Sequence, residues 1–219
     1  GPEVSLQAAR QMNDDMAAAR ERYHGRIEYF CSLPWQHAEL AASELKRAVA
    51  RGACGVMVLA NIDGEALTAE RFAPVWKAVD AARLPVLVHP TAPPGVQAMQ
   101  MQEFQLTASI GFTFDTTLAI SRMLYDGFFD RYTSLKIIAS HGAGALPYLI
   151  GRLDQCFNNI PACRTNTQAT PGSYMGRLFA DSVVFTPQAL DLCLQVFGDD
   201  AVLFGTDYPF ITFGKWLDA

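Results

Sequence analysis

Short apolar runs alternate with amphipathic stretches along the whole chain. The apolar runs predict strands at residues 26–32, 54–59, 86–89, 135–140, 180–184 and 202–205. Apolar positions at helical spacing predict helices between them, at residues 5–22, 36–51, 68–83, 113–125, 145–158 and 187–197. Such strict alternation is typical of parallel βαβ units. It indicates an α/β fold, either an open doubly wound sheet or a (β/α) barrel.

Local signals refine these boundaries. Ser5 and Thr68 are expected to be helix N-caps, because their side-chain oxygens can accept hydrogen bonds from the first turn. The run Cys54–Ala60 is apolar throughout, which predicts a strand buried on both faces. Residues 91–111 contain two adjacent prolines and a Met/Gln-rich stretch, which indicates a lid, a binding loop or a disordered segment.

Composition narrows the class of protein. The chain has 219 residues, of which 50% are hydrophobic, so one core and one domain over residues 1–219 are expected. The formal net charge of -5 argues against nucleic-acid binding, which usually shows a basic patch. No apolar run approaches the ~20 residues of a membrane span, and no signal peptide is visible at the N-terminus.

Cysteine usage points to a reducing compartment. The five cysteines form no C-x-x-C pair, and Cys31, Cys54 and Cys193 lie inside apolar segments. Free cysteines behave mostly as small buried hydrophobes. We therefore expect reduced thiols and a cytoplasmic protein.

Polar side chains follow three of the predicted strands. His89 and His141 come directly after apolar runs, and Asp207 lies just past the last strand. Active sites of α/β sheets and barrels are built at this carboxyl rim, and two imidazoles with a carboxylate suit a divalent metal ion. Each residue also has a structural interpretation, as a hydrogen-bonded core histidine or a turn-capping aspartate. His24 and His37 are expected at the surface.

Three ordered motifs resemble a known family. They are VHP at 88–90, ASHGAGALPYLIGRLD at 139–154 and LFGTDYPF at 203–210. Residues 11–34, QMNDDMAAARERYHGRIEYFCSLP, agree with the same family. Together they resemble the amidohydrolase-related metal-dependent decarboxylases, the family of the aminocarboxymuconate-semialdehyde and γ-resorcylate decarboxylases.

The resemblance implies a (β/α)8 TIM barrel of the metal-dependent hydrolase type with one divalent metal, usually Zn²⁺, and Mn²⁺ is the alternative for this chain. It implies that His89 and Asp207 bind the metal and that His141 moves protons. It implies that Arg152 reaches into a neighbouring subunit to hold a substrate carboxylate, and that Phe210 lines the substrate pocket. On its spacing alone, Arg152 is a solvated residue of a helix face.

The chain also departs from the family pattern. The family carries two further metal ligands in an H-x-H or E-x-H pair on its first strand, and this sequence has no H-x-H. Six predicted strands match the third to eighth strands of the family. We therefore expect a barrel that lacks its first two strands and final helices, in either a fragment or a naturally truncated member. Gly1-Pro2 fits a cleavage scar and native family sequence equally well.

Three functions are compatible with these residues. The leading hypothesis is a metal-dependent carboxy-lyase that acts on a small unsaturated or aromatic carboxylic acid, with His141 as the proton carrier. The second is a metal-dependent hydrolase of an ester, lactone or amide, with Asp207 as proton acceptor. The third is a degenerate barrel that binds a ligand or partner without turnover. Unpaired edges at strands 26–32 and 202–205, together with Arg152, predict a homodimer, or a chain whose missing segments fill the gap.

Overall fold

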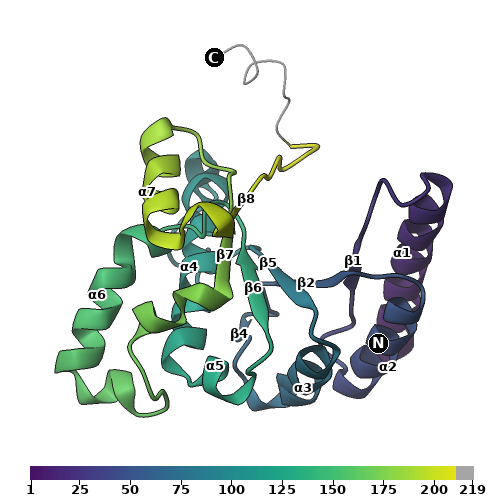
Figure 1. Cartoon of the computed structure of the whole chain (residues 1–219), viewed down its shortest axis with the longest axis horizontal. Helices are drawn as coiled ribbons and strands as arrows, with labels where there is room; N and C mark the ends of the chain where they lie inside the picture. Colours follow the sequence, from purple (N-terminus) through teal and green to yellow (C-terminus); the bar gives the residue numbers. More distant parts are fainter. Residues whose placement is uncertain (211–219) are drawn as a thin grey trace.

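Six parallel strands form the main sheet of the protein. A computed structural model of the chain describes residues 1–210. In sheet order the strands are β1 (Phe30–Ser32), β2 (Gly55–Leu59), β5 (Pro85–His89), β6 (Lys136–Ala139), β7 (Leu178–Asp181) and β8 (Val202–Leu203) (Figure 1). Neighbours in the sheet follow one another along the chain, so the strand order has no switch point. This order confirms the prediction of a barrel wall and excludes the doubly wound alternative.

The register brings the carboxyl ends of the strands to one rim. Phe30 lies opposite Gly55, and Leu59 lies opposite His89. Val88 lies opposite Ala139, two residues before His141. Parallel pairing in this register therefore places the polar residues that follow the strands on the same side of the sheet.

Helices connect the strands and lie along the outside of the wall. They are α1 (Pro2–Arg22), α2 (Ala38–Ala50), α3 (Ala73–Ala82), α4 (Phe112–Tyr125), α5 (Phe128–Arg131), α6 (Leu146–Asn159) and α7 (Pro187–Phe197). In Figure 1 the sheet runs between an α1–α2 pair at one end and an α6–α7 pair at the other. No helix among residues 1–210 combines the length and apolarity needed to cross a membrane.

Two predicted helix starts are wrong. Ser5 lies inside α1, whose N-cap is Gly1, because Pro2 occupies the first turn with its φ already helical. Thr68 precedes a 3-10 turn at Glu70–Phe72, and α3 begins only at Ala73. A second proline in the first turn of α3 sets that later start.

The connections contain more structure than the sequence predicted. The segment expected as a loop at 91–111 includes a 3-10 turn at Glu103–Gln105 and a π-helical turn at Thr107–Gly111. A short antiparallel hairpin, β3 (Asn61–Ile62) with β4 (Glu65–Ala66), follows β2. Further 3-10 turns cover Pro161–Arg164, Pro171–Arg177 and Asp199–Ala201. Elements of two to seven residues are too short to show a hydrophobic period.

The two faces of the sheet differ in burial. Val56, Val58 and Val88 point towards the helices and are fully buried in the main core. The alternate residues face the inside of the wall, and Leu59 is 37% exposed. Burial of β2 on both faces was therefore a wrong prediction. Between α1 and the inner face of the wall lies a groove of about 390 Å³, lined largely by apolar side chains that include Met57 and Leu87.

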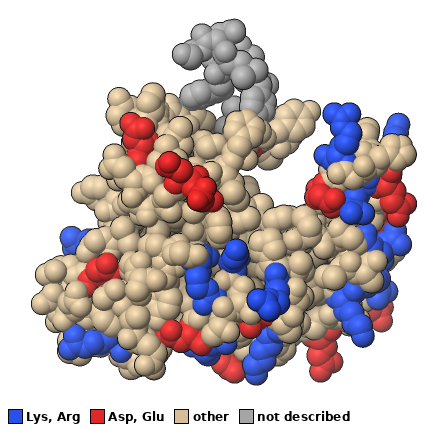
Figure 2. All heavy atoms as spheres, in the orientation of Figure 1, with Lys and Arg blue, Asp and Glu red and all other residues tan. Residues whose placement is uncertain are grey.

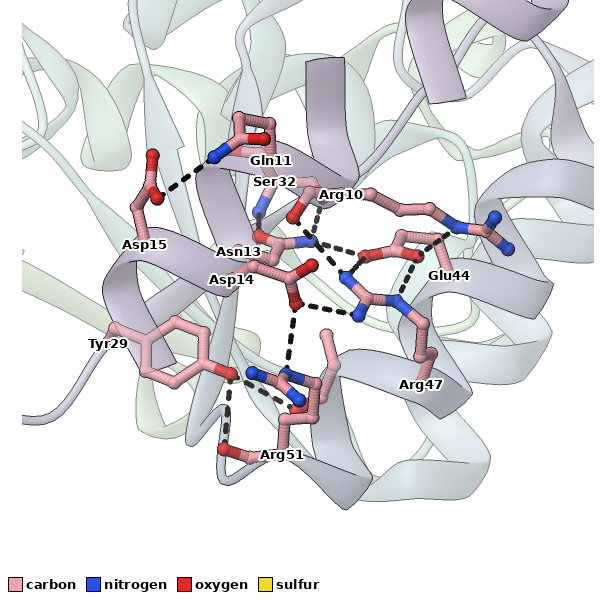
Figure 3. Close-up of polar contacts among 11 residues, drawn as sticks. Arg10, Gln11, Asn13, Asp14, Asp15, Tyr29, Ser32, Glu44, Arg47 and Arg51 are labelled. Atoms are coloured by element: carbon pink, nitrogen blue, oxygen red, sulfur yellow. Dashed lines mark hydrogen bonds and ion pairs between the residues drawn. The ribbon is translucent and has the colours of Figure 1, made fainter. Parts of the chain in front are cut away.

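A buried ion-pair network ties α1 to α2 (Figure 3). Glu44 on α2 is fully buried, and its carboxylate accepts hydrogen bonds from Arg47, Arg10 and Asn13. Burial opposes ionisation of Glu44, but the hydrogen bonds from Arg47 and Asn13 outweigh it and hold the pKa of that carboxyl below its usual range. Figure 2 shows charged side chains of both signs mixed over this α1–α2 end.

Asn13 also covers the open edge of β1. Its Nδ2 donates to the backbone oxygen of Ser32 at 3.0 Å, and its Oδ1 accepts from the Ser32 N–H at 2.9 Å. The side-chain amide thus takes the place of a neighbouring strand at that residue. The expectation of an unpaired edge over 26–32 is therefore wrong at Ser32, where a backbone pair that would attract another chain is already satisfied.

Candidate functional site

Three side chains from three strand ends converge at the carboxyl rim. His89 is the last residue of β5, His141 follows β6, and Asp207 follows β8. One potential ligand atom from each lies within 4.8 Å of the others. His141 Nε2 is 3.7 Å from Asp207 Oδ1, and the two imidazole rings stand at 73° with their centroids 5.4 Å apart. The structure thus brings together the three polar residues that the sequence singled out.

The orientation of His89 follows from a backbone contact. Its Nδ1 lies 2.9 Å from the carbonyl oxygen of Pro90. A carbonyl oxygen can only accept a hydrogen bond, so Nδ1 must carry the proton. In the neutral ring, Nε2 then has the free lone pair that a metal ligand needs.

A buried polar pair holds the loop that follows His89. The Thr91 N–H donates to Asp115 Oδ2 at 3.1 Å. Asn61 Nδ2 lies 3.0 Å from both Asp115 oxygens and 3.2 Å from the carbonyl oxygen of Ala92. Burial raises the pKa of Asp115, while the hydrogen bonds from Thr91 and Asn61 act in the opposite direction. Sequence reasoning missed both Asn61 and Asp115, although the carboxylate among apolar residues at the start of α4 was a visible signal.

His141 begins a tight left-handed turn. Residues 141–144 all have φ between 58° and 63°. Glycine adopts this conformation freely, whereas other residues seldom do, which accounts for the two glycines of the HGAG motif. A Cβ on Gly144 would lie 2.2 Å from the carbonyl oxygen of Thr113. Non-glycine residues with this left-handed backbone conformation tend to cluster at functional sites. His141 and Ala143 both have this conformation.

Asp181 anchors that turn from the neighbouring strand. It is the last residue of β7, and its Oδ1 accepts hydrogen bonds from the N–H groups of Gly142 and Val183, each at 3.0 Å. Sequence reasoning missed Asp181. The signal was available, because Asp181 also lies at the carboxyl end of an apolar strand, as His89 does.

The three converging residues form the polar wall of an apolar chamber. The chamber has a volume of about 620 Å³, and its other lining residues include Phe112, Val183, Val184 and Phe210. None of the described residues that line it is a lysine or an arginine. A smaller space of about 310 Å³ reaches the same three residues from the inner face of the wall.

Of the remaining predicted residues, only Phe210 lies at the chamber. Phe210 lines the chamber and is 84% exposed. Arg152 lies on the exposed side of α6 and does not line the chamber of its own chain. His24 is exposed after α1, and His37 is half-buried at the N-cap of α2.

The donor set fits a divalent transition metal. Two imidazole nitrogens and a carboxylate oxygen are ligands that Zn²⁺ and Mn²⁺ accept in proteins. Metal–ligand bonds of about 2.1 Å place two ligands of one ion no more than ~4.2 Å apart. The present donor atoms all lie within 4.8 Å of one another, close to that limit.

Comparisons with known proteins agree with this geometry. A family model described as "Amidohydrolase" matches residues 1–219. The chain is 31% identical over 211 residues to 2-amino-3-carboxymuconate-6-semialdehyde decarboxylase of Dictyostelium discoideum, covering 95% of this chain and 58% of that protein. It superposes on the crystal structure of 5-carboxyvanillate decarboxylase of Sphingomonas paucimobilis with a TM-score of 0.88 and 25% identity, covering 96% of this chain and 64% of that one.

A further solved structure contains a metal. The dihydroxybenzoic acid decarboxylase of Polaromonas sp. JS666, with bound manganese and the inhibitor 2-nitroresorcinol, is similar with a TM-score of 0.85 and 27% identity. That match covers 97% of this chain and 68% of the Polaromonas chain. The present chain spans less than two thirds of the length of the Dictyostelium and Sphingomonas proteins.

Proposed function

This chain belongs to the amidohydrolase family, and we propose that it carries the metal site of a decarboxylase that acts on a small aromatic or unsaturated carboxylic acid. One observation carries the proposal: His89, His141 and Asp207 converge at the wall of an apolar chamber. About 620 Å³ is within the usual size of a small-molecule site. Its apolar walls suit a flat unsaturated body, and the polar wall suits the carboxylate.

His89 and Asp207 would hold the ion, which is Zn²⁺ in this proposal, with Mn²⁺ as the alternative that the Polaromonas structure supports. When bound, the ion supplies positive charge that orients the oxygens of the substrate. Asp181 keeps the His141 turn in place through Gly142, so the imidazole faces the chamber without rearrangement.

The side chains of the site must also deliver a proton to the substrate. Decarboxylation breaks the bond between the substrate carbon and its carboxyl carbon, and CO₂ leaves. The electron pair stays on the substrate carbon, which must then receive a proton. His141 is the proposed donor, because imidazole is a common general acid and base in enzymes. Asp207, 3.7 Å away, can stabilise the protonated ring and return a proton from solvent.

Arg152 requires a different explanation, because it does not line the chamber of its own chain. We propose that it serves the site of a second copy in a homodimer. Its exposure on α6 supports this role, as does Tyr148 one turn earlier, which is 80% exposed. The test mixes Arg152→Ala with His141→Ala: a heterodimer holds one intact site and recovers part of the activity. A monomer in sedimentation, or no recovery despite subunit exchange, removes Arg152 from the site.

The free cysteines support a cytoplasmic location. All five are unpaired, and cytoplasmic proteins rarely contain disulfides.

The function is tested by assaying CO₂ release with a panel of hydroxybenzoates and muconate-type acids, beside esters, lactones and amides for hydrolysis. CO₂ release that is lost in His141→Ala and Asp207→Ala, and kept in His24→Ala, supports the decarboxylase. Hydrolysis without CO₂ release would replace it with a hydrolase. A protein that binds metal and substrate analogues but turns over neither class would be a binding barrel.

A further inference from the structure

A single peptide group joins a buried carboxylate to His89. The peptide between Pro90 and Thr91 accepts the His89 Nδ1–H at its oxygen, at 2.9 Å. The N–H of the same peptide donates to Asp115 Oδ2, at 3.1 Å. The chain of contacts therefore runs from the Asp115 carboxylate through one amide to the imidazole, and Nε2 lies at its far end.

We propose that Asp115 is a positioning residue, which sets the tautomer and orientation of His89 for metal binding through the Pro90–Thr91 peptide. The inference rests on the proposed function in one respect, which is that His89 binds a metal ion. Metal-binding histidines usually donate their second N–H to a carboxylate or a carbonyl, which fixes the ring and raises its basicity. Here the carbonyl is that of Pro90, and the Asp115 carboxylate bonds the N–H of the same peptide. Because hydrogen bonds in a chain polarise one another, the carboxylate makes this carbonyl a stronger acceptor for the His89 N–H.

Asn61 makes this arrangement rigid. Its Nδ2 contacts both Asp115 oxygens and also the Ala92 carbonyl, so the loop after His89 is held on both sides of Thr91. Its Oδ1 accepts the Gly64 N–H at 2.9 Å, which fixes which end of the amide faces Asp115. Rotation of the 90–91 peptide would break two partly buried hydrogen bonds at once.

The charge environment of Asp115 supports the inference. Asp115 is 2% exposed, and its hydrogen-bond partners are the neutral amides of Asn61 and Thr91; the positive charge of Arg122 also acts on it, but without a hydrogen bond. Glu44, a similarly buried carboxylate, is instead paired with Arg47 and Arg10. Buried charges are usually paired or close to a metal. A cation at His89 would partly balance the negative charge of Asp115, a balance that Glu44 already has from its arginines.

The decisive experiment compares Asp115→Asn with Glu44→Gln. Both variants replace a buried carboxylate that an asparagine amide contacts, but only Asp115 is linked to His89. Affinity for Zn²⁺ and Mn²⁺ is measured by competition with a chelator. We expect a loss of about 10- to 100-fold in Asp115→Asn and wild-type affinity in Glu44→Gln. Asp115→Ala, which also removes the acceptor for Thr91, should lose at least as much.

A second readout is independent of metal and of activity. Histidine side-chain ¹⁵N NMR of the metal-free protein should show His89 with its proton on Nδ1. In Asp115→Ala it should become a mixture of both tautomers. Wild-type His89 protonated on Nε2 would overturn the inference, as would equal affinity losses in Asp115→Asn and Glu44→Gln. If the wild type binds no metal, the proposed function fails, while the tautomer of His89 still decides this inference.

Discussion

The Asp181 carboxylate holds the Gly142 backbone, and through it the neighbouring residue His141. Gly142 donates its N–H to Asp181 Oδ1 at 3.0 Å, and Val183 donates to the same oxygen. Asp181→Ala leaves both N–H groups without their acceptor, so we expect a loss of about 1–3 kcal/mol in the free energy of unfolding. Asp181→Asn keeps an acceptor oxygen and should lose less. Urea denaturation measures both, and equal losses would mean that the charge, not the acceptor, matters.

The left-handed turn at 141–144 makes a prediction about its second glycine. Gly144→Ala adds a Cβ that would lie 2.2 Å from the Thr113 carbonyl oxygen, at a φ of 63°. We expect severe destabilisation, because neither the backbone of α4 nor the turn can move away cheaply. The matched control is Gly151→Ala on α6, where nothing lies within 4 Å of the new Cβ. That variant should be stabilised by about 0.5–1 kcal/mol. Similar thermal midpoints in the two variants would contradict this account.

Removal of metal should reveal which residues hold it. Zn²⁺ at 100 times its dissociation constant should stabilise the protein by about 2.7 kcal/mol against unfolding. EDTA should abolish that gain. His89→Ala and Asp207→Ala should show little or no stabilisation by Zn²⁺, whereas His24→Ala, an exposed histidine, should behave as wild type. The measurement is thermal unfolding with and without Zn²⁺, and an unchanged gain in Asp207→Ala would exclude Asp207 as a ligand.

The buried network at α1–α2 makes a prediction about pH. The folded-state pKa of Glu44 is lowered, so its carboxylate contributes stability above its unfolded pKa and loses it as pH falls through the folded value. Glu44→Gln removes the charge and one acceptor oxygen, and so weakens charged hydrogen bonds that are each worth about 1.5–3 kcal/mol. Its deficit against wild type should be full at pH 7 and should shrink below about pH 4, the ordinary range of a glutamate. Urea unfolding across this pH range is the test. If the difference in free energy of unfolding between Glu44→Gln and wild type does not vary with pH, the substitution acts through packing and not through the charge of Glu44.

Thiol reactivity should follow burial. Cys31 is fully buried, and burial raises its pKa to about 12. Burial also raises the pKa of Cys193. Because the thiolate is the reactive form, both should resist iodoacetamide at pH 8 until the protein unfolds. Cys156 and Cys163 are partly exposed and should be alkylated in the folded protein. Peptide mass spectrometry locates the label, and early modification of Cys31 would contradict the position of β1 in the sheet.

Much of the fold was predictable because its signals are local. Apolar runs such as Pro85–His89 identify strands, and the amphipathic segments between them indicate parallel pairing, while the sequential strand order came from the structure. The placement of His89, His141 and Asp207 on one rim follows from that pairing, because the carboxyl ends of parallel strands share an edge. Helix starts were less predictable, since prolines and backbone geometry overrode the side-chain caps expected at Ser5 and Thr68.

By itself, the sequence determined where the strands lie along the chain and the rim at which polar residues gather. Only the tertiary structure decided what holds those residues in place. Asn61 meets Asp115 across 54 residues, and Asn13 meets the Ser32 backbone across 19. Such pairs leave no periodic pattern, because each depends on where two separate helices or loops come to lie. Periodicity is a property of neighbouring residues, whereas a buried hydrogen bond between distant ones exists only after the whole wall has folded.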